Sequence, residues 1–186
     1  SYCPQIQASD SNDAVERVFI NYASTYGYPL SSIGSHAFSG ALLPYYAKCA
    51  IALFGTYGYE MNPVNLNKED IVQINEIAEL YKKYHLDCIQ NGDLYRMESP
   101  YETNHMSMIC VAKNKEKAIA IFFNKRRESN LSRFIKFDGL DDETLYQNSL
   151  DGKIYSGKQL RLVGINLIKW LEEFETIVIT FDKVEN

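Results

Sequence analysis

The segment "QASDSNDAVER" (Gln7–Arg17) gathers acidic and polar side chains directly after a short apolar stretch. Asp10, Asp13 and Glu16 lie close together in it. A carboxyl group in such a place can cap the helix that comes next, or it can exchange protons as a general acid and base. Spacing alone favours the cap for Asp10, because Asp, Asn and Ser are the commonest N-cap residues. Asp13 and Glu16 are expected to stabilise the N-terminus of the helix, and Arg17 to pair with a carboxylate in a structural role.

Other residues with chemical potential are scattered. His36 could contact a substrate at a strand end, although a histidine after Gly-Ser more often satisfies local backbone groups. Tyr45 and Tyr46 could stack on a sugar, but buried or interface tyrosines are commoner. The cysteines and histidines show no zinc-ligand spacing, so we expect no metal and buried, reduced thiols. These residues are Cys3, Cys49, Cys88, Cys110, His36, His85 and His105.

Composition narrows the class of protein. The 186 residues are enough for one large or two small domains, and 46% hydrophobic with 23% charged residues is ordinary for a globular protein. The net charge of −5 and the lack of a basic stripe argue against a nucleic-acid partner. No stretch is long and apolar enough to span a membrane, and no signal peptide is visible, so we expect a cytoplasmic protein. The chain has no initiator Met, which suggests a piece of a longer protein.

The first half of the chain alternates between strand and helix patterns. Tyr2–Gln7 and Leu30–Phe38 are expected to be strands and Asn12–Tyr26 an amphipathic helix. Leu42–Phe54 is small and apolar, which indicates a buried helix or a mixed segment. Asn67 is a good N-cap for a longer helix. This alternation is typical of a parallel α/β architecture.

After Asp93 the pattern changes to the period of two that is typical of half-buried strands. The strand candidates are Met106–Ala112, Ala118–Phe123, Arg133–Phe137 and Thr176–Asp182. Turn signals separate them at Lys113–Lys117, Asp138-Gly139, Asp151-Gly152 and Ser156-Gly157. The expected fold class is therefore α/β followed by an all-β antiparallel sandwich.

Several segments, in this order, resemble the C-terminal portion of bacterial α-galactosidases of glycoside hydrolase family 36. "PQIQASDSNDAVER" resembles that family's Pro-Gln-Ile-Trp-x-Ser-Asp-x-x-Asp-Ala-x-Glu-Arg, and "YPLSSIGSH" resembles Tyr-Pro-x-Ser-x-Met-Gly-x-His. "FGTYGYEMN" resembles Phe-Gly-x-Phe-Gly-Tyr-Glu-Leu, "IQNGDLYRMESP" the junction into the C-terminal sandwich, and "YSGKQLRLVGI" a segment within it. Together the matches cover nearly the whole chain.

The resemblance implies a retaining glycoside hydrolase that cleaves terminal α-galactosides of the melibiose and raffinose type. It implies that residues 1–91 are the last strands and helices of a catalytic (β/α)₈ barrel. Residues 92–186 would then form the C-terminal antiparallel β-sandwich. No cofactor and no metal are implied.

The resemblance also assigns site residues. It makes Asp10 the acid/base, and it places Gln7 where the family has a Trp beside the sugar. Gln7 and His36 are the candidate substrate-binding residues. The family's nucleophile lies in a Lys-Trp-Asp motif, but the single Trp here, Trp170, stands in "KWLE" and is expected to serve packing. The chain also lacks the Cys-Ser-Gly-Gly-Gly substrate segment, and its loop from Ala37 to Tyr46 is shorter than the family pattern.

This chain would therefore carry one half of a catalytic pair and be inactive alone. The expected partners are an α-galactoside or oligosaccharide substrate, the missing N-terminal part of the same enzyme and further copies in a homo-oligomer. Nucleic acid and membranes are not expected. Two alternatives remain open: a non-catalytic carbohydrate-binding or subunit-assembly module, and an α/β protein in which Asp10 is only a helix cap.

Overall fold

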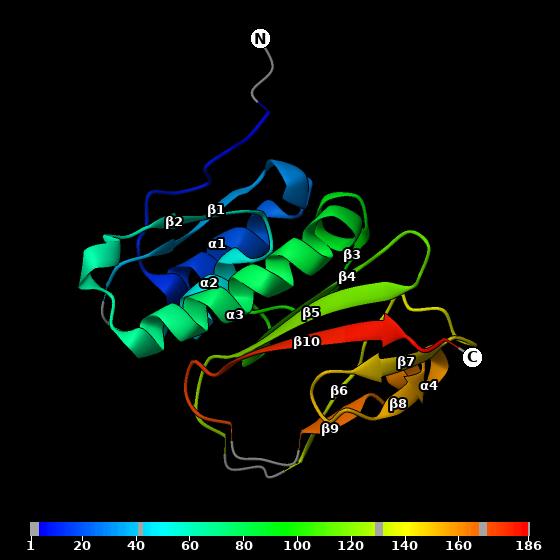
Figure 1. Cartoon of the computed structure of the whole chain (residues 1–186). Coiled ribbons are helices and arrows are strands. Elements are labelled where there is room, and N and C mark those ends of the chain that lie inside the picture. Colours follow the sequence, from blue (N-terminus) through cyan, green and yellow to red (C-terminus); the bar gives the residue numbers. More distant parts are fainter. Residues whose placement is uncertain (1–3, 41–42, 129–131, 168–170, 186) are drawn as a thin grey trace. The chain divides into compact units, whose positions relative to one another are not determined.

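The computed structural model describes residues 4–40, 43–128, 132–167 and 171–185, and it divides into two units, residues 1–86 and 87–186 (Figure 1). Cys3 and Trp170, and with Trp170 its expected packing role, lie outside the described residues. Each unit is considered by itself below.

Unit 1 is built on parallel strand pairing. Strands β1 (Gly34–Phe38) and β2 (Thr56–Glu60) pair in parallel, and helix α2 (Tyr45–Ala52) makes the crossover between them (Figure 1). On the other side of β1, Ile6 forms a parallel bridge with Ile33 through two backbone hydrogen bonds of 2.7 Å. Of the strand expected over Tyr2–Gln7, the described residues 4–7 form only this bridge. The α/β alternation expected from the sequence is confirmed.

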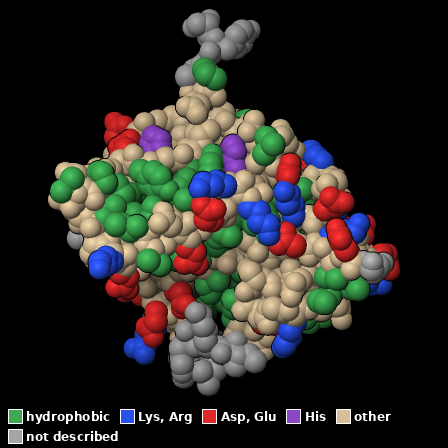
Figure 2. Space-filling model, viewed as in Figure 1, with side chains coloured by type: hydrophobic (Ala, Val, Ile, Leu, Met, Phe, Trp, Pro, Cys, Tyr) green, Lys and Arg blue, Asp and Glu red, His purple; other side chains and the backbone are tan. Residues whose placement is uncertain are grey.

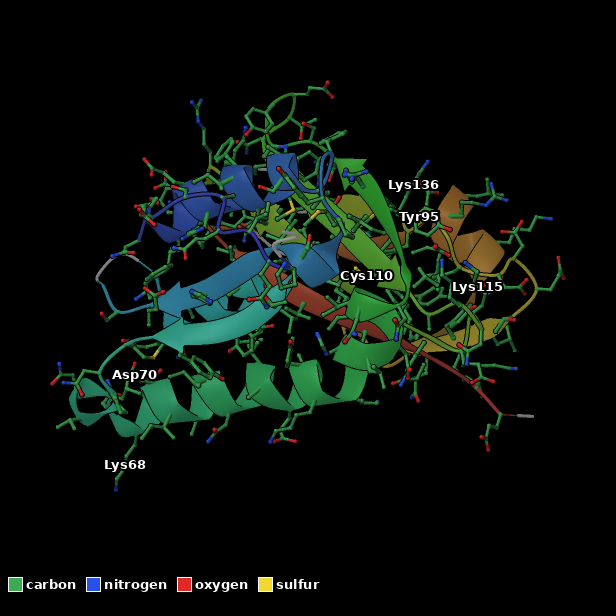
Figure 3. The ribbon with its side chains drawn as sticks, turned by 90° about the horizontal axis from the view of Figure 1, so that it is seen from above. Lys68, Asp70, Tyr95, Cys110, Lys115 and Lys136 are labelled. Atoms are coloured by element: carbon green, nitrogen blue, oxygen red, sulfur yellow. The ribbon has the colours of Figure 1, made fainter. Side chains whose placement is uncertain are left out.

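The two longer helices of unit 1 begin at capping residues. Helix α1 (Ala14–Ser24) has Asp13 as its N-cap, and the Asp13 carboxylate accepts a 2.9 Å hydrogen bond from the amide of Glu16. Helix α3 (Lys68–Tyr84) starts with a capping box between Asn67 and Asp70 (Figure 3). The expected role of Asn67 as an N-cap is therefore confirmed.

Helix α2 is buried, whereas other elements of unit 1 leave apolar groups exposed. This helix is small and apolar, as the sequence predicted, with Cys49 and Ala50 fully buried. Tyr59 at the end of β2 is 44% exposed, and Val64 in the 3₁₀ turn Pro63–Asn65 is 87% exposed. Figure 2 shows hydrophobic side chains gathered on the surface over this part of the unit.

Unit 2 is antiparallel throughout its described residues. Its larger sheet has the order β3-β4-β5-β10-β7-β8, and its smaller sheet pairs β6 with β9. The strands are β3 (Asp93–Glu98), β4 (His105–Val111), β5 (Lys117–Asn124), β6 (Arg133–Ile135), β7 (Leu145–Asn148), β8 (Ile154–Ser156), β9 (Ile165–Leu167) and β10 (Thr176–Lys183). A π-helical turn, His85–Gln90, precedes β3.

The two sheets of unit 2 share one apolar core. Phe122 of β5 and Phe181 of β10 lie in it together with Ile135 of β6 and Ile165 of β9. The Phe181 ring packs edge-on against Phe137, with ring centroids 4.8 Å apart. On the surface, the Lys115 ammonium lies 5.7 Å from the centre of the Tyr95 ring (Figure 3).

The sequence located the strands β4, β5, β6 and β10 but not β3, β7, β8 and β9. One turn prediction is wrong: Ser156-Gly157 begins helix α4 (Gly157–Leu162), where Ser156 and Gln159 form a capping box. Glycine is required there, because a Cβ atom at Gly157 would stand 2.0 Å from the carbonyl oxygen of Asp141.

Candidate active site

Asp10 lies in the loop between the Ile6 bridge and helix α1, with its side chain exposed. Asp13, not Asp10, occupies the N-cap of the helix, and Glu16 stands in its first turn. The interpretation of Asp10 as merely a cap is therefore wrong, whereas the roles expected for Asp13 and Glu16 are confirmed. Asp10 is a carboxyl group that the helix does not use.

The loop that carries Asp10 is held by hydrogen bonds from its own hydroxyl groups. The Ser9 hydroxyl accepts a 3.1 Å bond from the amide of Ser11. The Ser11 hydroxyl donates a 2.6 Å bond to the Glu16 carboxylate. Short polar side chains that bond to nearby backbone groups fix turns of this kind. The backbone at Asp10 is therefore ordered locally.

Gln7 lies beside Asp10. Its side-chain amide donates a 3.2 Å hydrogen bond to Oδ1 of Asp10. The two candidate residues are thus brought together, and one carboxylate oxygen of Asp10 has a neutral donor as its neighbour. An amide offers this donor where an aromatic ring would offer an apolar face.

His36 lies in β1 and reaches across to the end of β2. Its Nδ1 stands 3.0 Å from Oε1 of Glu60, and the side chains are 30% and 50% exposed. Gly58 makes room for the ring, because a Cβ atom there would stand 2.8 Å from Cδ2 of His36. Sequence reasoning missed Glu60, although its position at the end of "FGTYGYE" offered a signal: an exposed acid directly after a run of aromatic and glycine residues.

Arg17 is the only one of these charged groups that is fully buried, with 3% of its surface exposed. Burial lowers the pKa of its guanidinium, and the negative charges of Glu60 and Asp10 oppose this effect. Arg17 and His36 line the same small cavity together with Asn21. Asp10, Glu60 and Arg17 thus interact electrostatically, while His36 is joined to them through Glu60.

Tyr45 and Tyr46 are the first two residues of α2. Both are half-buried. The Lys48 ammonium lies 4.5 Å from the centre of the Tyr45 ring, and burial lowers the pKa of Lys48. The backbone amide of Tyr46 donates a 2.9 Å bond to the side chain of Gln73.

Within the described part of the chain, no group of three or more His, Cys, Asp or Glu side chains is placed to hold a metal ion. Cys49, Cys88 and Cys110 are free and buried, as expected. Burial raises the pKa of all three thiols, that of Cys88 to about 12, so they stay protonated and unreactive. None of the described helices combines the length and the apolar character needed to cross a bilayer.

Two family models match the chain. Residues 1–92 match the model described as Melibiase, and residues 105–181 match the model described as Glycosyl hydrolase family 36 C-terminal domain. The two matches are consecutive along the chain and do not overlap. The match in the second half falls on a C-terminal domain.

Curated relatives and solved structures give the same result. The chain is 30% identical to the bifunctional α-galactosidase/sucrose kinase AgaSK of Mediterraneibacter gnavus, over 99% of this chain and 20% of that protein. The crystal structure of the α-galactosidase AgaB from Geobacillus stearothermophilus is 27% identical and has a TM-score of 0.91, over 97% of this chain and 26% of that one. A variant of AgaA from the same organism, in complex with raffinose, is 26% identical with a TM-score of 0.87, over 95% of this chain and 25% of that one. The chain spans about a quarter or less of the length of these three proteins.

Proposed function

The chain belongs to glycoside hydrolase family 36, and from this we propose that it is the C-terminal portion of a retaining α-galactosidase with Asp10 as the acid/base. The observation that carries the proposal is the position of Asp10 and its exposure to solvent. Its carboxyl group is exposed, stands on a braced loop at the end of a parallel strand segment, and is not used to cap the helix. The family membership also favours the hydrolase over the alternative of a non-catalytic carbohydrate-binding or subunit-assembly module.

The architecture that we propose is the end of a catalytic (β/α)₈ barrel in residues 1–91 and an antiparallel sandwich in residues 92–186. Three parallel segments in chain order, at Ile6, β1 and β2, support the barrel. In such barrels the reacting groups stand at the C-terminal ends of the strands. Asp10 follows the first segment, and Glu60 ends β2, which agrees with this rule.

In the proposed reaction, Asp10 first donates its proton to the glycosidic oxygen while a second carboxylate attacks the anomeric carbon. Asp10, now ionised, then takes a proton from the water that releases galactose. Retaining enzymes place the two carboxyl groups about 5–5.5 Å apart. The sequence lacks the nucleophile's Lys-Trp-Asp motif. The nucleophile would therefore come from an N-terminal part of the same enzyme, which is the first partner we propose.

The substrates we propose are terminal α-galactosides of the melibiose and raffinose type. The raffinose complex of the similar AgaA variant supports this class. Gln7 and His36 are the proposed substrate-binding residues. The Gln7 amide would contact the leaving group or the sugar beside Asp10, and Glu60 would orient the His36 ring.

Two further proposals concern the setting of the enzyme. The exposed apolar side chains Tyr59, Val64 and Val72 support a surface that other parts of the enzyme or further copies in a homo-oligomer would cover. The free, buried thiols support a cytoplasmic location, because disulfides are rare in reducing compartments.

The test is Asp10→Asn in the complete enzyme, with Asp13→Asn as the matched control. Loss of general acid–base assistance should slow hydrolysis of melibiose, which has a poor leaving group, by about 10²–10⁴-fold. An activated aryl galactoside should still form the covalent intermediate and then stall. Azide, which needs no base, should attack that intermediate and give α-galactosyl azide with retained configuration.

Asp13→Asn keeps the helix cap, since Asn caps about as well as Asp. Its rates of hydrolysis of melibiose and of the aryl galactoside, and its melting temperature, should be close to those of the parent enzyme. Melibiose cleavage at near-normal rates by Asp10→Asn would show that another group is the acid/base.

A further inference from the structure

We propose that Arg17 is the positioning residue of Asp10: it fixes the backbone on both sides of this carboxyl group. The proposal rests on the function proposed for Asp10 and adds the residue that holds it in place.

The guanidinium of Arg17 binds two carbonyl groups of the loop. Nη2 donates a 2.6 Å hydrogen bond to the carbonyl oxygen of Ser9, and Nε donates a 2.7 Å bond to that of Ser11. Ser9 and Ser11 are the neighbours of Asp10 in the chain. The planar fork of one side chain therefore restrains the peptide unit between Ser9 and Asp10 and the one between Ser11 and Asn12, on either side of the reacting residue.

Arg17 is itself held rigidly. It belongs to helix α1, which Asp13 caps, and its guanidinium carbon lies 5.1 Å from the centre of the buried Phe38 ring at the end of β1. Asp10 is thus connected through Arg17 to both a helix and a strand. A catalytic group supported in this way keeps its position better than one that stands on an unsupported loop.

The burial of Arg17 costs stability that packing alone would not require. Its Nη1 is buried and has no hydrogen-bond partner among the described residues. A buried charge with an unsatisfied donor is less favourable than an apolar side chain of similar volume. A role confined to packing would be served by Met at this position. The two carbonyl bonds, and the nearby charges of Asp10 and Glu60, give the reason for arginine.

The positioning role makes a prediction that general destabilisation does not. The rate of glycosylation depends on the position of Asp10 only when the leaving group needs a proton. Because kcat/KM reports the steps through glycosylation, Arg17→Met should lower kcat/KM for melibiose about 10²-fold. The kcat/KM for an activated aryl galactoside should fall less than about threefold. Arg17→Lys keeps the charge but not the fork, and it should give an intermediate loss for melibiose.

The matched control is Asn21→Ala, one turn further along the same helix. Asn21 is also buried and polar, and it bonds to the Ser35 hydroxyl and the Ile51 carbonyl instead of the Asp10 loop. Its removal should destabilise the unit and lower kcat/KM for both substrates by the same factor. Equal losses for both substrates in Arg17→Met and in Arg17→Lys would overturn the proposal.

A second measurement does not depend on activity. Hydrogen–deuterium exchange of the complete enzyme should show faster exchange at residues 8–12 in Arg17→Met, but not in Asn21→Ala. Unchanged exchange there would overturn the proposal. If the parent enzyme does not cleave melibiose, or if Asp10→Asn cleaves it normally, the proposed function fails instead, and faster exchange would still show that Arg17 holds the loop.

Discussion

Two histidine–glutamate pairs distinguish the two units. In unit 1, Nδ1 of His36 in the middle of β1 lies 3.0 Å from Oε1 of Glu60 at the end of the parallel strand β2, and both side chains reach solvent. In unit 2, Nε2 of His105 lies 2.8 Å from Glu128, and these side chains are only 4% and 19% exposed. The same two residue types therefore form an accessible pair in one unit and an internal pair in the other.

The surroundings explain this difference. His105 stacks on Phe122 with ring centroids 5.3 Å apart, and Arg133 forms an ion pair with the neighbouring Glu98. Every residue of β4, which carries His105, is buried. β2, in contrast, ends in the exposed residues Tyr59 and Glu60. Unit 2 buries His105 beside its core, whereas unit 1 leaves the end of β2 exposed, with Glu60 as its last residue.

The largest expected effect tests whether unit 1 is complete. This chain alone should show no hydrolysis of a nitrophenyl α-galactoside above a mock preparation, because it lacks the nucleophile's motif. The complete enzyme should hydrolyse the same substrate under the same conditions. Turnover by the isolated chain at a comparable rate would mean that a second carboxylate of this chain serves as the nucleophile.

The next effect concerns the exposed pair, His36 and Glu60. Gly58→Ala should displace the His36 ring, since the new Cβ atom would stand 2.8 Å from it. Misplacement of a site residue by about 1 Å can cost about 10²-fold in rate, so we expect a loss of that order in kcat/KM for melibiose. Gly27→Ala is the control, because a Cβ atom there meets nothing within 4 Å. Equal activities of the two variants would remove His36 from the site.

The smallest effect concerns the internal pair, His105 and Glu128. His105→Gln should lower the free energy of unfolding by about 1–3 kcal/mol, because the half-buried Glu128 carboxylate loses one of its two partners and keeps only the Asn104 amide. His36→Gln should change it little, since that pair is open to solvent. Chemical denaturation of the two variants measures the contrast, and an equal loss of stability would contradict it.

His105 of the internal pair also makes the stability of the fold depend on pH. Burial, together with the nearby Arg133, lowers the pKa of His105 below its usual 6.5. The unfolded chain therefore binds a proton more readily than the folded one. The contribution of His105 to the free energy of unfolding should be complete above pH 6.5, and it should be lost as the pH falls below that value. The parent enzyme should show this slope in its melting temperature, and His105→Gln should flatten it.

The sequence predicted some helices and strands but not others. Periodicity and caps located α1, α3 and the long strands β4, β5 and β10, because each spans several repeats of its period. The short strands β8 and β9 have three residues each, too few to show an alternation. The change of unit falls at residues 86–87, inside the π-helical turn, where neither glycine nor proline marks it.

The sequence predicted the residues of the candidate site but not their contacts. A motif resemblance singled out Asp10, Gln7 and His36, but the sequence could not reveal the hydrogen bond between Gln7 and Asp10. Glu60 escaped notice because its partner, His36, is distant in the chain and meets it only through the parallel register of β1 and β2. Arg17 was expected to pair with carboxylates, whereas its hydrogen bonds go to carbonyl groups.

The contact between Arg17 and the Asp10 loop has a consequence for how such sequences can change in length. Each residue added to an α-helix rotates the remainder of that helix by about 100°. One residue inserted between Ala14 and Arg17 would carry the guanidinium away from both carbonyl groups, although every side chain of the motif would still be present. Related sequences that keep an acid/base carboxylate at the position of Asp10 should therefore show no insertions or deletions between Asp10 and Arg17, even where substitutions are frequent.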